Sequence, residues 1–168
     1  MPSRSTAFVA GVALVLLAGL ASNAKANANA NADLTEQPAA WTLDAIAWQT
    51  KAANGTRYAL LEGDRGTGNA PFSYAFSIPA GVFDAPHRHS ATARVFVAKG
   101  VLEIGFGDRF DPAALHAYPA GSYVIVPANM VHFDGSHVDT VIIGTATGPW
   151  STAYLDGSQP ASAGTPVH

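Results

Sequence analysis

The chain contains no cysteine. Disulfides, thiolate metal ligands and a cysteine nucleophile are therefore excluded. Charged residues are also scarce, at 12% of the sequence, and the chain has no basic stripe, polybasic patch, nucleotide-binding glycine loop or serine–histidine–acid set. We therefore expect no nucleic-acid partner and no attraction to a charged membrane surface. What remains is a chain of 168 residues, a length that suits one domain with a substantial core.

The N-terminal segment has the layout of a secretory signal peptide. A short basic start, Met1 to Arg4, precedes a run without polar side chains from Ala7 to Ala21, and small residues follow. As a helix this run would rise about 22 Å, which is less than the roughly 30 Å of a bilayer core, so cleavage is favoured over a membrane anchor. We predict a signal peptide over residues 1–26, a periplasmic or secreted location, and no membrane contact after cleavage.

The composition divides the rest of the chain into three parts. Cleavage after Ala26 leaves seven basic and twelve acidic residues, which changes the formal net charge from −3 to −5. An alternating Ala/Asn run predicts a flexible linker over residues 27–40, and a Ser-, Ala-, Gly- and Pro-rich composition predicts a disordered tail over 157–168. Residues 41–156 then form the folded domain.

Within this domain the sequence consists of short runs rich in aromatic and β-branched residues. Glycine, proline, asparagine or aspartate separates the runs at intervals of about eight to twelve residues, as in sandwiches and barrels. The expected strands cover residues 58–61, 72–78, 94–98, 101–106, 123–126, 130–133 and 138–143. This pattern predicts an all-β fold with one short helical turn at 112–115. Because there is no internal repeat, we expect one barrel.

Three histidines are the strongest candidates for chemistry. In a strand His87 and His89 would point to the same face, while Arg88 between them would point away. A third imidazole, His132, belongs to another strand-like run. Three imidazoles on a rigid sheet can hold a metal and leave positions open for water or substrate. From these residues alone, surface histidines on a strand edge remain the alternative.

The segments around these histidines resemble the two conserved motifs of the cupin superfamily. The matching positions are Gly81, His87, His89 and Gly100 in the first motif, and Gly121, Pro127, Asn129 and His132 in the second. The resemblance extends over residues 41–155. It implies a single jelly-roll-like cupin β-barrel of two antiparallel sheets, with one divalent metal ion on His87, His89 and His132. By analogy with cupins that pair through exposed edges, it also suggests a homodimer.

The chain departs from the cupin pattern at one position. The family's glutamate four residues after the second histidine is Ala93 here, and the next residue, Arg94, is not a ligand. Three outcomes are open: a three-histidine iron(II) centre, a zinc, copper, nickel or manganese site with water in the missing place, or a relic that binds metal weakly. We favour iron(II) or zinc, although imidazole suits all of these metals.

Other acidic and histidine side chains could fill the gap, but each has a simpler interpretation. We interpret Glu103 as a solvent-facing strand residue. Asp84 and Asp134 are typical of turns, and His116 and His137 are typical of the surface.

Alternate residues of each strand should line the barrel interior. The aromatic candidates for this lining are Tyr74, Phe76, Phe96, Phe106, Tyr123 and Phe133. We assign Tyr74 and Tyr123 as catalytic candidates because their hydroxyls could orient a ligand or bound oxygen. Arg94 could pair with an acidic substrate if it faced inward, but alternation from Ala93 predicts that it faces outward.

These observations lead to two hypotheses on function. The first is an exported, metal-dependent oxidoreductase of the dioxygenase type, or an isomerase, that acts on a small oxygen-bearing substrate. The alternative is a non-catalytic periplasmic protein that binds a metal or a small ligand. The sequence leaves the substrate, the metal, turnover and the oligomeric state open.

Overall fold

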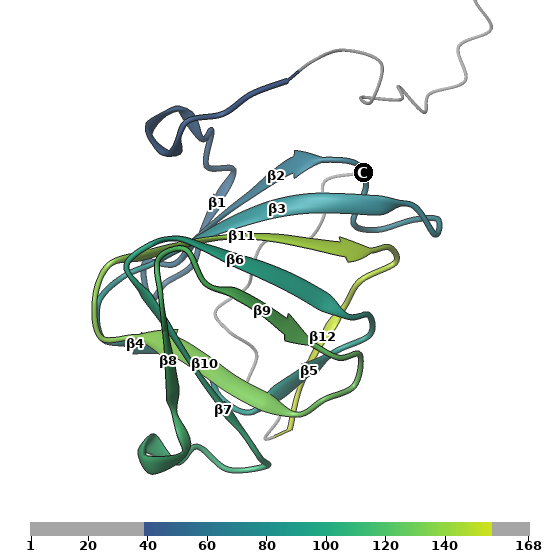
Figure 1. Cartoon of the computed structure of the whole chain (residues 1–168). Helices are drawn as coiled ribbons and strands as arrows, with labels where there is room; N and C mark the ends of the chain where they lie inside the picture. Colours follow the sequence, from purple (N-terminus) through teal and green to yellow (C-terminus); the bar gives the residue numbers. More distant parts are fainter. Residues whose placement is uncertain (1–38, 156–168) are drawn as a thin grey trace, which may run out of the picture. The chain divides into compact units, whose positions relative to one another are not determined.

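The computed structural model describes residues 39–155 (Figure 1). The predicted signal peptide, the linker up to residue 38 and the predicted tail lie outside these residues. Within the described range, no helix is long and apolar enough to cross a membrane.

The described residues form two antiparallel sheets (Figure 1). The first sheet has six strands in the order β1-β2-β3-β11-β6-β9. Their bounds are β1 Thr50–Lys51, β2 Arg57–Glu62, β3 Pro71–Ile78, β11 Thr140–Thr147, β6 Ala93–Lys99 and β9 Tyr123–Val126. The edge strand β9 ends directly before Pro127, where a missing backbone N–H is tolerated.

The second sheet has the order β12-β5-β10-β7-β8, and a further strand, β4, also pairs with β10. The bounds are β4 Val82–Phe83, β5 His87–His89, β7 Val101–Phe106, β8 His116–Pro119, β10 His132–Ser136 and β12 Thr152–Tyr154. Two 3₁₀ turns complete the domain, η2 at Leu43–Ala45 and η3 at Pro112–Ala114, the second at the predicted helical turn. This architecture confirms the predicted all-β, two-sheet cupin barrel.

The core lies between the two sheets and follows the alternation of the strands. In β6 the side chains of Ala93, Val95 and Val97 are buried, while Arg94 and Phe96 are exposed. In the facing sheet, β7 contributes two buried side chains to the same apolar cluster. The members of this cluster are Ile78, Ala93, Val95, Val97, Leu102, Ile104, Val124, Val126 and Ile142. Burying each larger member contributes about 1.5–3 kcal/mol, which makes this cluster the main support of the barrel.

Two positions with positive φ fix the connections that the cupin motifs require. Gly100 joins β6 to β7 at φ +77°, where a Cβ atom would collide with Thr140. Asn129 has φ +62° in the turn before β10, and its backbone N–H donates to the carbonyl of His89 at 2.8 Å. The turn of the second motif is therefore bound directly to the histidine strand of the first.

Strand β10 is longer than the sequence predicts. It begins at His132 and continues through Asp134, which is typical of a turn in the sequence, and through Gly135. Strand β4 pairs with β10 at Gly135 and lies so close that a Cβ atom on Gly135 would collide with Val82 and Phe83. The glycine therefore serves close strand packing, and the interpretation of Asp134 as a turn residue is wrong.

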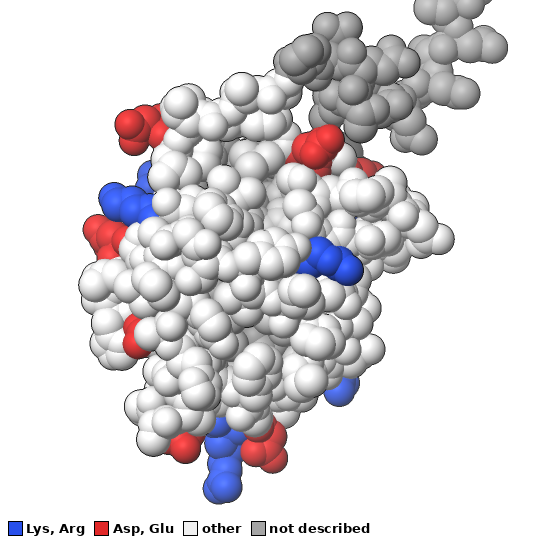
Figure 2. Space-filling model, viewed as in Figure 1, with Lys and Arg blue, Asp and Glu red and all other residues white. Residues whose placement is uncertain are grey.

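The outer surface carries few charges. On the face drawn in Figure 2, most lysine, arginine, aspartate and glutamate side chains lie near the edges, and much of the area between them is uncharged.

Candidate metal centre

Strands β5 and β10 bring the three candidate ligands together. His132 pairs directly with His87 in the antiparallel register, so the two side chains share one face of the sheet. His89 lies two residues beyond His87 and points to the same side. One ring nitrogen from each of the three histidines lies within 4.8 Å of the others. The three predicted ligands therefore converge on one point inside the barrel.

Each imidazole is oriented through its Nδ1 atom. Nδ1 of His87 lies 2.8 Å from the Ala85 carbonyl, and Nδ1 of His132 lies 3.0 Å from the Met130 carbonyl. A carbonyl only accepts, so both Nδ1 atoms carry a proton, and Nε2 is the nitrogen left to bind an ion. Nδ1 of His89 lies 3.0 Å from the Thr152 hydroxyl on β12. Outer hydrogen bonds of this kind are typical of metal-binding histidines.

Burial keeps two of the imidazoles neutral. It lowers the pKa of His89 to about 2, with the neighbouring His87 and His132 rings adding to the effect. Burial also lowers the pKa of His132, although the Asp134 carboxylate partly opposes it. Neutral imidazole is the form that binds a metal ion, so these rings need no deprotonation at neutral pH.

The Asp134 carboxylate lies beside these rings, in a strand where the sequence predicts a turn. Asp134 follows His132 by two residues in β10 and therefore points to the same face. Its Oδ2 atom lies 3.5 Å from Nε2 of His132 and 4.0 Å from Nε2 of His87. The alternation from His132 was the signal that could have identified it.

A second carboxylate forms an outer layer next to the histidines. The Tyr154 hydroxyl donates to Oδ2 of Asp84 at 3.1 Å, and the Tyr154 ring lies 5.1 Å from the His87 ring. Burial raises the pKa of Asp84, and the nearby Asp134 charge raises it further. Asp84 occupies a loop, as expected, but its carboxyl group also belongs to the surroundings of the site.

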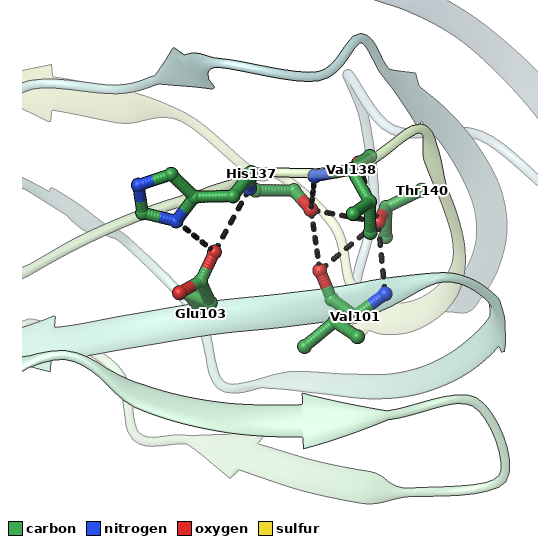
Figure 3. Close-up of polar contacts among 6 residues, drawn as sticks. Val101, Glu103, His137, Val138 and Thr140 are labelled. Atoms are coloured by element: carbon green, nitrogen blue, oxygen red, sulfur yellow. Dashed lines mark hydrogen bonds and ion pairs between the residues drawn. The ribbon is translucent and has the colours of Figure 1, made fainter.

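Neither Ala93 nor Glu103 offers a ligand. Ala93 is buried in the apolar core on β6. Glu103 lies on the opposite face of β7 from its buried neighbours Leu102 and Ile104. Its carboxylate accepts hydrogen bonds from the backbone N–H of His137 at 2.9 Å and from the ring Nδ1 at 2.7 Å (Figure 3). It therefore faces away from the interior, as expected, but beneath His137 its side chain is only 17% exposed.

An aromatic wall formed by Trp150 and Tyr74 flanks His89. The Trp150 ring lies 4.4 Å from the His89 ring and stacks on Tyr74 at 5.3 Å. The Arg65 guanidinium lies 4.7 Å from the centre of the Trp150 ring. Within the described residues, Nε1 of Trp150 is buried without a hydrogen-bond partner. Tyr74 is buried in this wall, which raises the pKa of its hydroxyl.

The structure places the other catalytic candidate outside the barrel. Tyr123 is 59% exposed and pairs with Phe96, which is 44% exposed, on the outer face of the first sheet. The expectation that these two residues line the interior is wrong, because Val95 and Val97 take the inward positions of β6. Arg94 is exposed, as predicted, and the cation beside the aromatic wall is Arg65 instead.

The remaining lining candidates take three different positions. Phe76 packs against the interior clusters. Phe106 pairs with His132 and shares its face, but it is 46% exposed. Phe133 is fully buried on the opposite face of β10 from His132, where its ring contacts Phe110. It therefore belongs to a packing layer outside the barrel interior.

A hollow of about 500 Å³ adjoins the outer layer of the site, within the usual size range of small-ligand pockets. It is lined by Phe83, Asp84, Ala85, Pro86, Asp108, Arg109, Phe110 and Leu155. Asp84 is therefore shared between this hollow and the surroundings of the histidines.

The two-sheet barrel and its histidine strands define a cupin. Comparison with protein families is more specific: residues 36–151 match the ChrR cupin-like domain, so the chain belongs to that family. No curated protein matches the chain.

Solved structures show the same fold at low sequence identity. The polyketide cyclase RemF from Streptomyces resistomycificus aligns with a TM-score of 0.58 and 11% identity over 74% of this chain and 90% of its own. A putative acetylacetone dioxygenase from Methylibium petroleiphilum aligns with a TM-score of 0.55 and 23% identity over 73% of this chain and 85% of its own. A cupin-like protein from Thermotoga maritima aligns with a TM-score of 0.52 and 19% identity over 71% of this chain and 96% of its own.

Proposed function

We propose that this protein binds one divalent metal ion through His87, His89 and His132. The observation that carries the proposal is the arrangement of the three rings, which are held through Nδ1 and converge inside the barrel. Three neutral imidazoles fit such an ion and suit iron(II) or zinc first, with copper, nickel or manganese as further candidates.

We further propose an exported metalloenzyme of the dioxygenase or isomerase type that acts on a small oxygen-bearing substrate. When bound, the metal would polarise an oxygen atom of that substrate. The Trp150 indole and the Arg65 guanidinium offer a donor and a positive charge beside His89. On the other side, the Asp84 carboxyl and the Tyr154 hydroxyl can hold a proton near His87.

The hollow beside Asp84 supports a small substrate, because it combines the aromatic ring of Phe110 with the charge of Arg109. The names of two structural neighbours, an acetylacetone dioxygenase and a polyketide cyclase, make β-diketones the first compounds to test. Export rests on the signal-like layout of residues 1–26.

A non-catalytic metal- or ligand-binding protein is the second candidate. It is favoured by Ala93, because the carboxylate that the cupin motif places there is missing.

Metal content of protein purified without chelator tests the proposal. We expect one ion per chain in the native protein and loss of that ion in His87→Ala and His132→Ala. His116→Ala is the matched control, because His116 is exposed on β8 and should keep the ion. Substoichiometric metal that is equal in all four proteins would overturn the proposal.

Oxygen uptake by the iron-loaded protein then separates the enzyme from the binder. The substrate panel contains β-diketones, thiols and hydroxylated aromatics. Uptake that depends on both substrate and His132 supports the enzyme, and none across the panel favours the binder.

A further inference from the structure

We propose that Asp134 supplies a fourth protein ligand, a carboxylate oxygen, to the metal ion held by the three histidines. The inference rests on the proposed metal site and identifies a ligand that the cupin motifs do not contain. Asp134 comes from β10, whereas the missing glutamate of the motif would have come from β6 at Ala93.

The distances from Asp134 to two of the three histidines are close to those of ligands that share one metal ion. Two adjacent ligand atoms that each lie about 2.0–2.1 Å from one ion are separated by about 2.8–3.4 Å in octahedral or tetrahedral geometry. Oδ2 of Asp134 lies 3.5 Å from Nε2 of His132 and 4.0 Å from Nε2 of His87. These are the ring atoms left to bind an ion, because both Nδ1 atoms donate to backbone carbonyls. Both separations are slightly longer than this range, so the Asp134 side chain would have to move closer to the two rings when an ion binds.

The Asp134 carboxylate has no other partner that would explain its position. Among residues 39–155 it accepts no hydrogen bond and forms no ion pair with a lysine or arginine, and its side chain is only 24% exposed. A partly buried carboxylate that faces neutral imidazoles is unfavourable without a cation. Asp84 differs in this respect, because its carboxylate accepts a hydrogen bond from Tyr154.

The backbone keeps Asp134 in register with the histidines. Asp134 pairs with Ile104 of β7, and its own carbonyl accepts from the Asp84 N–H at 2.7 Å. His132, two residues earlier, pairs with both Phe106 and His87. A carboxylate at position 134 therefore keeps its inward direction whatever residue occupies position 93.

A fourth ligand of this kind would change the charge of the site. Three imidazoles leave a divalent ion with its full charge of two, whereas an added carboxylate reduces the charge of the centre to one. Asp134 would then restore the three-histidine, one-carboxylate set of the motif from a different strand.

Cobalt(II) bound to the full chain tests the inference without any activity. We expect Asp134→Asn to lower cobalt affinity by about 100-fold or more and to change the visible spectrum. The matched control is Asp84→Asn. Its cobalt affinity should fall by no more than roughly 10–100-fold, the usual effect of removing a hydrogen-bond partner outside the ligand set, and its visible spectrum should not change. Melting temperatures of the metal-free variants check that both fold.

A cysteine at the same position gives a direct signature. The chain contains no cysteine, so a thiolate-to-cobalt charge-transfer band in Asp134→Cys can come only from position 134. We expect this band in Asp134→Cys and not in Asp84→Cys.

Two outcomes separate this inference from the function on which it rests. If the native chain binds no cobalt, the metal site itself is wrong. If the native chain binds one cobalt ion but Asp134→Asn keeps its affinity and spectrum, or the one-to-one complex of Asp134→Cys lacks the band, the site stands and Asp134 is not a ligand.

Discussion

His132 lies directly opposite His87 in the pairing of β10 with β5, and the two ring centroids are 4.2 Å apart. One ladder position therefore unites ligands from two parts of the chain that are 45 residues apart. This pairing places the two rings next to each other, with an angle of 55° between their planes.

Because the site is assembled only in the folded barrel, metal should stabilise the native state. We expect saturating zinc, at about 100 times its dissociation constant, to add about 2.7 kcal/mol to the free energy of unfolding. His132→Ala should lose this gain and His116→Ala should keep it. Thermal unfolding with and without zinc measures the difference, and an equal gain in both variants would contradict the prediction.

The metal-free protein should lose stability as the pH falls through the range of ordinary histidine. Burial lowers the pKa of His89 to about 2 in the folded state, against 6.5 as the reference, so the unfolded chain binds the proton first. His89 alone should therefore reduce the free energy of unfolding by up to about 1.4 kcal/mol per pH unit below 6.5. Urea unfolding of the chelated protein between pH 7 and 5 gives this slope, which His89→Gln should flatten.

Asp84 should have the opposite pH dependence. Burial and the charge of Asp134 raise its pKa in the folded state, so the folded protein keeps the proton longer than the unfolded chain. This contribution to stability is full below the ordinary aspartate pKa of 3.8 and is lost as the pH rises through the raised value. Asp84→Asn should therefore stabilise the metal-free protein at pH 7 and have little effect at pH 3. A loss at pH 7 in chemical denaturation would show that the hydrogen bond from Tyr154 dominates.

Restoring the carboxylate of the cupin motif should destabilise the empty barrel. In Ala93→Glu a charge enters the apolar cluster, at a cost of about 3 kcal/mol or more in the metal-free protein. Bound metal should recover part of this cost. Paired unfolding curves with zinc and with chelator test both statements, and Ala93→Gln separates the effect of charge from that of size.

The two tyrosines assigned as catalytic candidates should now behave differently. Tyr123→Phe removes an exposed hydroxyl and should leave metal binding and turnover unchanged. Tyr74→Phe keeps the stacking on Trp150 but removes a hydroxyl from the wall beside the site. We expect it to weaken diketone binding or turnover about tenfold without a change in cobalt affinity, within the range of one lost hydrogen bond. Equal behaviour of the two variants would exclude a role for the Tyr74 hydroxyl.

Local alternation predicts the strands and the shared face of His87 and His89, whereas the place of His132 in the cluster follows from the resemblance to the cupin motifs. His87 and His89 share a face in any strand, and the punctuation by turn residues marks most strand ends. Asp134 was missed because aspartate followed by glycine is typical of a turn. Here Gly135 instead makes room for β4. Tyr123 was misplaced because its direction depends on its pairing with Phe96, a contact between strands that no local pattern contains.

The groups that orient the three rings differ in one respect. The acceptors for His87 and His132 are backbone carbonyls, each two residues before its histidine, whereas His89 relies on the Thr152 side chain. No side-chain substitution can delete the first two acceptors, so evolution can adjust the orientation of only the third ring through its hydrogen-bond partner. Position 152, on the last described strand, is thus where natural variation or engineering can retune the centre while its other two rings stay in place.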